Sequence, residues 1–350
     1  MAKRVTIQDI ADELGLSRNT VSKALNNSGG IAQTTQKRII DKALEMGYKH
    51  FAYASSVFAH RTDISPETFA ETLGDKREIA LFSTTFLHGP HFASLMLDAF
   101  QNELSQLGFV LDAHRVTQRD IAQMSLPMTF KPERVAAIVC IEMFNCEYDE
   151  MLCAQGIPTL FVDAPARLDG RILPSDQLFM ESTAPVTRLV NDMLENGCTN
   201  IGFIGNWKHC QSFYERYSAF RLAMLMAGRD VPEALCIREN YSDGISRCID
   251  TLDKLPDLFI CANDFVALDA IQALRSLGYD VPHDIRVAGF DDSAESRRSI
   301  PQLTTIHIHT QSMAFSAIQL LQTRLREPSL DYRHVYTETE LIYRASTDKA

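Results

Sequence analysis

Three side chains suited to reading DNA bases lie close together near the N-terminus. Arg18, Asn19 and Lys23 fall at i, i+1 and i+5 of a polar stretch, a spacing that puts them on one face of a helix. Arg and Lys donate hydrogen bonds to guanine O6 and N7, and Asn pairs with adenine N6 and N7. The group therefore predicts a helix that reads base edges, although each residue alone could belong to a solvated surface.

A second group of polar and aromatic side chains lies farther along the chain, where apolar strands are expected to end. Carboxylates, an amide and a guanidinium can each make paired hydrogen bonds to vicinal hydroxyls. We therefore expect a cleft that binds a small polar effector, with a sugar or sugar derivative as the leading hypothesis. The candidate effector-binding residues are Phe86, His91, Phe92, Asp163, Arg216, Tyr241, Asn263 and Asp291.

Some of these residues have purely structural alternatives. Asn263 could be only a helix N-cap, Asp163 could serve a turn, and Phe92 could belong to the core. Arg216 is harder to explain in this way, because a guanidinium among Phe213 and Phe220 needs a polar partner.

Three short helices are expected in the first fifty residues, where they would position the DNA-reading side chains. Thr6 caps the first, with Asp9 in capping-box position, and Gly15 ends it. Ser17 caps the second helix, and Thr34 opens the third. The apolar positions expected to form their core are Ile7, Ile10, Ala11, Leu14, Val21, Ala24, Leu25, Ile40, Ala43 and Leu44.

Charge is distributed unevenly along the chain. The 350 residues carry a net charge of -11, but residues 1–50 contain eight Lys or Arg against five Asp or Glu, a balance of +3 that leaves -14 for the remainder. A basic head and an acidic body confine DNA contact to the head. The N-terminus has no secretory signal and no apolar run approaches the ~18 residues of a membrane span, so we expect a cytoplasmic protein.

From Glu78 onward, short apolar strands alternate with amphipathic helices. The expected strands include IALFS, FVLDA, VAAIVCI, TLFVD, NIGFIG, DLFICA and IRVAGF. Such alternation predicts an α/β architecture with parallel sheets covered by helices. So many strands exceed one compact sheet and indicate two doubly wound lobes with a cleft between them.

The order of motifs resembles the LacI/GalR family of transcriptional regulators over nearly the whole chain. The resemblance rests on TIQDIADELGLSRNTVSKALN, IAQTTQKRIIDKALEMGY, GFIG, NDFVALDA, VPHDIRVAGFDD, PQLTTIH and TELIYRAST. It implies a small all-α helix-turn-helix domain and a two-lobed, periplasmic-binding-protein-like domain. The implied function is that of a regulator, expected to be a repressor, whose affinity for double-stranded operator DNA is modulated by an effector.

The resemblance also implies domain boundaries. The DNA-binding domain would span residues 1–50, a linker 51–77, and the effector-binding and dimerisation domain 78–350. Within that domain, the first lobe would comprise residues of about 78–175 and 310–337, and the second those of about 176–309 and 338–350.

Family positions assign roles to individual residues by the same resemblance. Arg18, Asn19 and Lys23 match base-reading positions. Tyr241 matches an aromatic that stacks on the ligand. Phosphate-facing positions are matched by Thr6, Ser17, Thr20, Ser22 and Asn26, and effector-contacting positions by Asp163, Arg216, Asn263 and Asp291. The sequence departs from the family at Asp269, where Gly is usual, and at Ile308, where a polar residue often touches the effector.

The linker is the segment where the resemblance is poorest. It lacks the Pro-Asn step that in relatives precedes a short hinge helix, whose Leu wedges into the minor groove of the operator, and it runs about a dozen residues longer than usual. We expect Val57 or Phe58 to replace the missing Leu. A flexible tether that merely connects the domains is the alternative.

Other classes of function find little support in the sequence. GxSxG, P-loop, GxGxxG and HExxH motifs are absent, and Glu142 with Asp163 is only a conceivable carboxylate pair. We therefore expect no enzyme, cofactor or metal site, and interpret the eight cysteines as reduced structural thiols, with redox sensing by an exposed one left open. A transport-type sugar-binding protein is the alternative function. A homodimer is expected, because one helix-turn-helix makes few DNA contacts.

Overall fold

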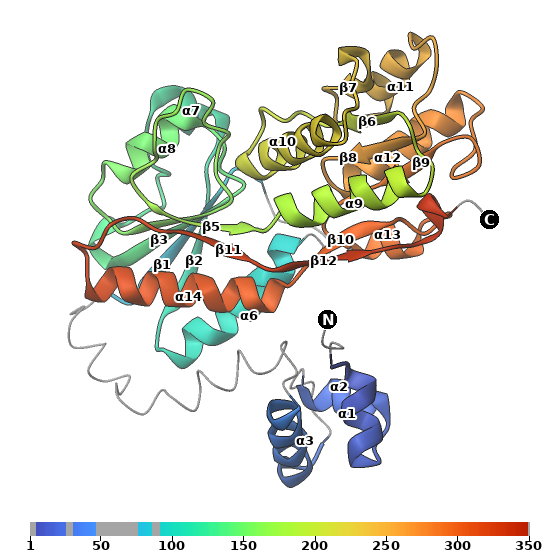
Figure 1. Ribbon diagram of the computed structural model, residues 1–350. Helices are drawn as coiled ribbons and strands as arrows, with labels where there is room; N and C mark the ends of the chain where they lie inside the picture. The colour runs from blue at the N-terminus through green and yellow to red at the C-terminus, as the bar shows by residue number, and fades with distance from the viewer. Residues whose placement is uncertain (1–4, 26–30, 47–75, 86–91, 349–350) are drawn as a thin grey trace. The chain divides into compact units, whose positions relative to one another are not determined.

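The chain divides into two compact units, residues 1–74 and 75–350. The computed structural model describes residues 5–25, 31–46, 76–85 and 92–348, and Figure 1 labels their elements. The predicted hinge residues Val57 and Phe58 lie outside the described residues, so their role stays a prediction.

The smaller unit contains three helices, of which the first two begin at the predicted caps; the third begins at Gln33, one residue before the predicted Thr34. Thr6 Oγ1 accepts a hydrogen bond from the Asp9 amide at 3.2 Å, and the Asp9 carboxylate accepts from the Thr6 amide at 2.8 Å. Gly15 ends the first helix at φ 64°, a left-handed conformation that glycine adopts without a Cβ penalty. Ser17 Oγ accepts from the Thr20 amide at 3.0 Å. The helices are α1 (Ile7–Leu14), α2 (Arg18–Leu25) and α3 (Gln33–Glu45).

One small core holds these three helices together. Its buried members are Ile10, Ala11, Val21, Ala24, Ile39 and Ala43. In α3 the buried residue is Ile39 rather than the predicted Ile40, because Ile39 lies one turn before Ala43 on the same helix face. The side chain of Leu44 lies outside the described residues.

The larger unit begins with a six-stranded parallel sheet, in the order β11-β5-β4-β3-β1-β2. Helices α6 and α14 pack side by side against this first lobe, which also carries α7 and α8 (Figure 1). Its strands are β1 (Glu78–Ser83), β2 (Val110–Arg115), β3 (Val135–Ile141), β4 (Thr159–Val162), β5 (Asp176–Met180) and β11 (His334–Thr337). Its helices are α6 (Phe92–Gln106), α7 (Gln118–Gln123), η2 (Pro132–Arg134), α8 (Cys146–Cys153) and α14 (Thr310–Arg326).

The second lobe contains a four-stranded parallel sheet in the order β7-β6-β8-β9 and an antiparallel pair, β10 with β12. Helices α9 and α10 pack together, and α11 and α12 pack over the apolar core of the sheet. The strands are β6 (Ile201–Ile204), β7 (Cys236–Ile237), β8 (Leu258–Cys261), β9 (Arg286–Ala288), β10 (Thr305–Ile308) and β12 (Thr339–Ile342). The helices are α9 (Thr183–Glu195), α10 (Gln211–Met226), η3 (Glu233–Leu235), α11 (Ser242–Asp250), α12 (Asp264–Ser276), α13 (Ala294–Arg298) and η4 (Ala345–Thr347).

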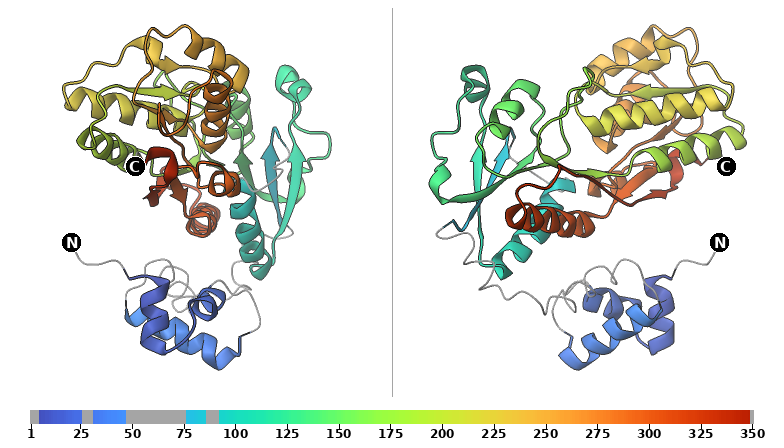
Figure 2. Two further views of the ribbon diagram at one scale, coloured as in Figure 1. Left: turned by 90° about the vertical axis from the view of Figure 1, so that its right-hand side faces the viewer. Right: turned by 60° about the vertical axis from the view of Figure 1, so that its left-hand side comes forward.

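The described chain passes between the lobes after β5, between β10 and α14, and between β11 and β12 (Figure 2). The first of these positions differs from the expected boundary at residue 175. Strand β5 pairs in parallel with both β4 and β11, so the first sheet extends to Met180.

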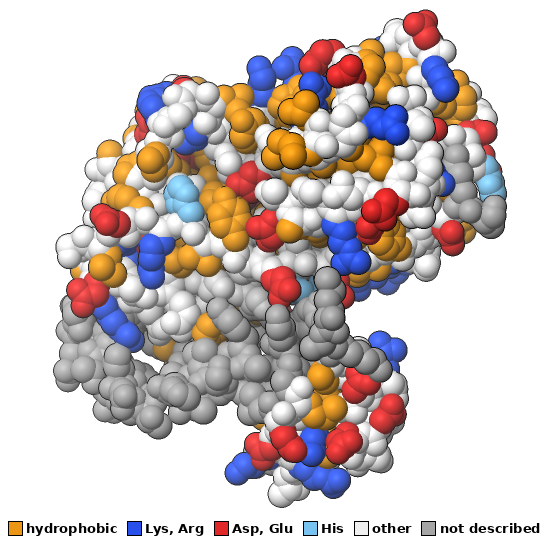
Figure 3. Space-filling view, in the orientation of Figure 1, with side chains coloured by type: hydrophobic (Ala, Val, Ile, Leu, Met, Phe, Trp, Pro, Cys, Tyr) orange, Lys and Arg blue, Asp and Glu red, His pale blue; other side chains and the backbone are white. Residues whose placement is uncertain are grey.

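Helix α10 departs from the usual distribution of polar and apolar residues at both of its ends, although most of its buried residues are apolar. Ser212 and Arg216 are buried in its N-terminal half, whereas Leu222, Leu225 and Met226 are exposed at its C-terminal end, where apolar side chains gather in Figure 3. Buried polar groups are the informative exception in a folded protein, because each needs a partner. The buried Ser212 and Arg216 therefore make the N-terminal half of α10 a candidate part of the functional site.

Among the residues that the structure describes, no helix combines the length and the apolar composition needed to span a bilayer.

Candidate functional site

The three predicted base-reading side chains share the exposed face of α2. Arg18, Asn19 and Lys23 are exposed, while Val21 and Ala24 are buried on the opposite side of the helix. The buried pair fixes α2 against α1 and α3 and leaves the polar face outward. The face can therefore enter a DNA major groove without disturbing the core.

The predicted phosphate-facing residues fall into different environments. Ser17 and Thr20 lie at the N-terminus of α2, and their hydroxyl oxygens are 2.8 Å apart. Backbone N–H groups and the helix dipole make such a terminus suitable for a phosphate. The Thr6 hydroxyl donates to Asp9 Oδ2 at 2.6 Å, as part of the α1 cap. Ser22 is partly buried, and Asn26 lies outside the described residues.

A cavity of about 490 Å³, its open mouth included, lies between the lobes of the larger unit. It is placed at the carboxyl ends of β3, β4, β6, β8 and β9, where open parallel sheets bind ligands. Its lining residues are Glu142, Phe144, Val162, Asp163, His209, Cys210, Ser212, Phe213, Arg216, Asn263 and Asp291.

Only part of the predicted effector set lines this cavity. The structure brings together Asp163, Arg216, Asn263 and Asp291. Tyr241 does not line it: this residue is 75% exposed at the N-terminus of α11. Phe86 and His91 lie outside the described residues, and Phe92 begins α6 with a side chain that is not described.

Asp163 joins the two lobes. It directly follows β4 of the first lobe, and its φ of 60° turns its carboxylate toward α10 of the second lobe. Oδ1 accepts from the Ser212 amide at 3.1 Å, and Oδ2 accepts from the Ser212 hydroxyl at 2.6 Å. The Gln211 amide donates to Ala164 O at 2.8 Å beside it. A first-lobe residue thus satisfies the N-terminus of a second-lobe helix.

Arg216 has the polar partners that its burial demands. Its Nη1 donates to Ala262 O at 2.6 Å and lies 3.9 Å from Asp291 Oδ1. The guanidinium carbon is 3.5 Å from the centroid of the Phe290 ring, so cation–π attraction adds to the fixing of its plane. Its Nε is buried and has no hydrogen-bond partner among the described residues.

Asn263 serves two purposes. Its Oδ1 caps α12 by accepting from the Val266 amide at 2.9 Å, as the structural alternative proposed, and the residue also lines the cavity. Its Nδ2 is then the group that it can offer to a ligand.

The aromatic walls come from residues that the sequence did not single out as ligand contacts. Phe144 follows β3, Phe213 lies in α10, and both rings pack near His209, with centroid distances of 4.8 and 5.8 Å. Burial lowers the pKa of His209. An apolar wall on each lobe can cover the two faces of a ring-shaped ligand.

Glu142 is another lining residue that sequence reasoning missed as a contact, having been weighed only as a partner of Asp163. It directly follows β3, so the position of a strand end was the signal that could have found it. Burial, together with the charge of Asp163, raises the pKa of Glu142 to about 7. Burial also raises the pKa of Asp291, against the opposing effect of Arg216. The cavity is therefore rich in carboxyl groups that hold protons readily.

A pH-dependent stability is expected from Glu142. Its carboxyl binds a proton more tightly in the folded protein than in the unfolded chain, so its contribution to stability is lost as pH rises from about 4.5 to about 7. Glu142→Gln should leave the free energy of unfolding nearly unchanged at pH 4 and raise it by about 1–3 kcal/mol at pH 8. Urea titrations of both proteins at the two pH values check this. An equal difference at both would contradict the assignment.

Comparisons with known proteins agree with both units. Residues 6–50 match the family of bacterial regulatory proteins, lacI family, and residues 190–347 match the periplasmic binding protein-like domain. The HTH-type transcriptional repressor PurR of Actinobacillus pleuropneumoniae is 27% identical over 97% of this chain and 98% of its own length. The HTH-type transcriptional regulator GalR of Lacticaseibacillus casei is 26% identical over 98% of this chain and 99% of its own length.

The chain carries the two domains of LacI/GalR-family regulators, and its relatives are named as such regulators. It is a DNA-binding transcriptional regulator, which confirms the main prediction rather than the transport-type alternative. Its relatives are named as regulators, not as enzymes.

Solved LacI-type structures share the predicted fold. The transcriptional regulator CelR in complex with cellobiose gives a TM-score of 0.67 at 21% identity, over 98% of this chain and 100% of the other. The lac repressor dimer bound to operator and the anti-inducer ONPF gives a TM-score of 0.63 at 18% identity, over 99% of this chain and 99% of the other. The all-α head and the two-lobed α/β body of this regulator are thereby confirmed.

Proposed function

We propose that this regulator binds a neutral, polyhydroxylated effector between its lobes and thereby changes its affinity for operator DNA. The observation that carries the proposal is the joint lining of one cavity by Asp163, Arg216, Asn263 and Asp291, with an aromatic wall on each lobe. Carboxyl groups and a guanidinium suit vicinal hydroxyls, and rings cover a sugar face. The cellobiose complex of the CelR neighbour supports this class of ligand.

Charge narrows the effector class further. Among the described lining residues, Arg216 is the only Lys or Arg, and its Nη1 already donates to Ala262 O. A sugar phosphate would therefore lack the cationic hydrogen-bond donors that a phosphate group prefers. A thermal-shift screen of the full chain should therefore find stabilisation by mono- or disaccharides and not by their phosphate esters. Stabilisation by the esters alone would refute the proposed class.

At the operator, Arg18, Asn19 and Lys23 are proposed to contact bases, with Ser17 and Thr20 at the backbone. Arg18→Ala should weaken binding to the cognate operator by about 1–3 kcal/mol and leave nonspecific binding nearly unchanged. Gel-shift titrations on cognate and scrambled duplexes measure both affinities. Equal losses on the two duplexes would move Arg18 to the phosphate-contacting class.

The remaining parts of the proposal concern assembly and location. We expect a cytoplasmic homodimer without enzymatic activity or cofactor, since two heads on a pseudo-palindrome multiply the specific binding energy. The lac repressor neighbour was solved as a dimer on its operator. Light scattering that shows a monomer at micromolar concentration, both alone and on operator DNA, would contradict the dimer.

A further inference from the structure

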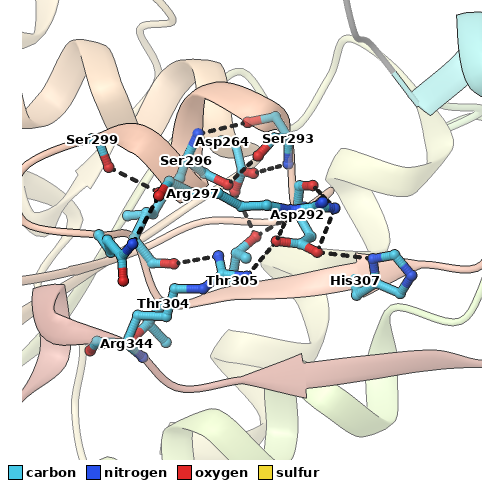
Figure 4. Close-up of polar contacts among 12 residues, drawn as sticks. Asp264, Asp292, Ser293, Ser296, Arg297, Ser299, Thr304, Thr305, His307 and Arg344 are labelled. Carbon is cyan, nitrogen blue, oxygen red and sulfur yellow. Dashed lines mark hydrogen bonds and ion pairs between the residues drawn. The ribbon is translucent and has the colours of Figure 1, made fainter. Parts of the chain in front are cut away.

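Two neighbouring acids in the loop after β9 point in different directions. Asp291 lines the effector cavity, whereas the carboxylate of Asp292 is buried on the far side of the loop, against β10 and the segment after β12 (Figure 4). Both residues have positive φ values, 117° and 55°. Such conformations are costly for residues other than glycine and persist only where the surroundings enforce them.

Hydrogen bonds to the Asp292 side chain hold the loop in this conformation. Arg297 donates to both carboxylate oxygens, at 3.1 and 2.8 Å, and Arg344 Nη2 donates to Oδ1 at 2.6 Å. His307 Nδ1 lies 3.0 Å from Oδ2. Burial alone would raise the pKa of Asp292, but the hydrogen bonds from His307, Arg297 and Arg344 outweigh it and lower the pKa to about 2. The group is therefore a permanent anion held by three cationic or polar side chains.

Asp264 is a second buried acid, directly after the cavity residue Asn263, but its partners are neutral and burial raises its pKa. Its Oδ2 accepts from the Ser293 amide at 2.7 Å, and its Oδ1 accepts from the Thr305 hydroxyl at 2.5 Å. The same hydroxyl oxygen accepts from the Asp292 amide at 3.2 Å. Two ligand-facing residues are thus each followed by a buried acid, and both acids are anchored to Thr305 on β10 (Figure 4).

One partner of Asp292 lies beside a place where the chain passes between the lobes. His307 is on β10, two residues before His309, which precedes α14 of the first lobe. Arg344 lies beyond the end of β12 that is farther from the first lobe, and its amide donates to Thr304 Oγ1 at 2.7 Å. Arg297 is on α13, a helix within the second lobe.

We propose that Asp292 is a positioning residue that couples the effector contact at Asp291 to the passage from β10 to α14, through His307. The inference rests on the proposed function, because this coupling has a consequence only if occupancy of the cavity controls operator binding. A purely local role, in which Asp292 only shapes its own loop, would involve Arg297 as much as His307.

A measurement without ligand or DNA separates these roles. The amides of Gln211 and Ser212 belong to the first turn of α10, where no intrahelical acceptor exists. They are bonded instead to Ala164 O and Asp163 Oδ1 of the first lobe. Their hydrogen–deuterium exchange in the full-length protein therefore reports opening of the lobes.

The test variant is His307→Asn, and its control is Arg297→Gln, which also removes a partner of the Asp292 carboxylate. His307→Asn should speed exchange at Gln211 and Ser212 by about tenfold, the effect of one charge-assisted hydrogen bond. Arg297→Gln should change it by less than about twofold.

Three outcomes would overturn the proposal. Equal effects of His307→Asn and Arg297→Gln would reduce Asp292 to a local role. Unchanged exchange in His307→Asn would show that Asp292 does not affect lobe opening. An equal acceleration at the β8 amides, within the core of the second lobe, would mean unfolding rather than coupling. Failure to find an effector would overturn the proposed function and leave these exchange rates interpretable.

Discussion

Arg216→Met is expected to lower the affinity for the effector by at least about a hundredfold, because it removes a guanidinium whose hydrogen bonds to a ligand are charge-assisted. Methionine keeps most of the side-chain volume against Phe290, and the raised pKa of Asp291 lets that carboxyl take a proton once its cation is gone. The Arg216→Met protein should therefore still fold but bind the effector poorly. Isothermal titration with a sugar identified by the thermal-shift screen gives the change directly.

Arg221→Met is the matched control for this experiment. Arg221 lies on the same helix, but its guanidinium carbon is 5.9 Å from the Tyr217 ring and the residue does not line the cavity. We expect its affinity for the same sugar to stay within about twofold of the unaltered protein. Retained affinity in Arg216→Met, or an equal loss in Arg221→Met, would remove Arg216 from the binding site.

Arg324→Met should destabilise the larger unit by about 3–5 kcal/mol, the effect of breaking a buried ion pair from one side. Arg324 Nε and Nη2 donate to the two oxygens of Asp176 at 2.9 and 3.1 Å, and both side chains are buried. The pair fastens α14 to β5, and Arg324 also donates to the carbonyls of Pro328 and Asp331. Urea unfolding followed by circular dichroism measures the loss.

Two further variants test that explanation. Arg326→Met, on the exposed side of the same helix, should change the free energy of unfolding by less than about 0.5 kcal/mol. Asp176→Asn added to Arg324→Met should recover more than about 1 kcal/mol, because the buried carboxylate, left with only the more distant Arg333 Nε at 3.8 Å, loses its charge while the Arg333 amide keeps its acceptor. No recovery in the double variant would show that packing, not charge, is lost.

Local signals in the sequence predicted the small domain well. The Thr6–Asp9 capping box, the Gly15 terminus and the outward face of α2 each depend on residues within one or two helical turns. The error at Ile40 was one position in a helix whose apolar residues are adjacent, where the sequence cannot say which of the two faces the core.

Pairing between strands that are far apart in the sequence limited what could be predicted for the large domain. Strand β5 was assigned to the second lobe because nothing in its own residues reveals that β4 and β11 flank it. The same limit applies to the cavity. Phe144 and Glu142 become wall residues through the meeting of strand ends from two sheets, whereas Tyr241, placed by resemblance, lies in solvent.

Polar residues at strand ends were the most informative part of the sequence for the effector site. Asp163, Arg216, Asn263 and Asp291 were chosen as groups able to bind hydroxyls, and they meet in one cavity. Their second roles could not be read in advance. The cap that Asp163 provides to Ser212 spans 49 positions in the chain and depends on the closeness of the two lobes.

The late position of β11 in the chain has a consequence for synthesis on the ribosome. Strand β11 covers the edge of β5, yet 157 residues separate Met180 from Thr337, because the chain builds most of the second lobe in between. At ordinary rates of translation this interval lasts roughly 10–30 s. During that time the nascent first lobe exposes an unpaired strand edge, a template for wrong pairing. Newly made chains should therefore depend on chaperones far more than the finished protein does.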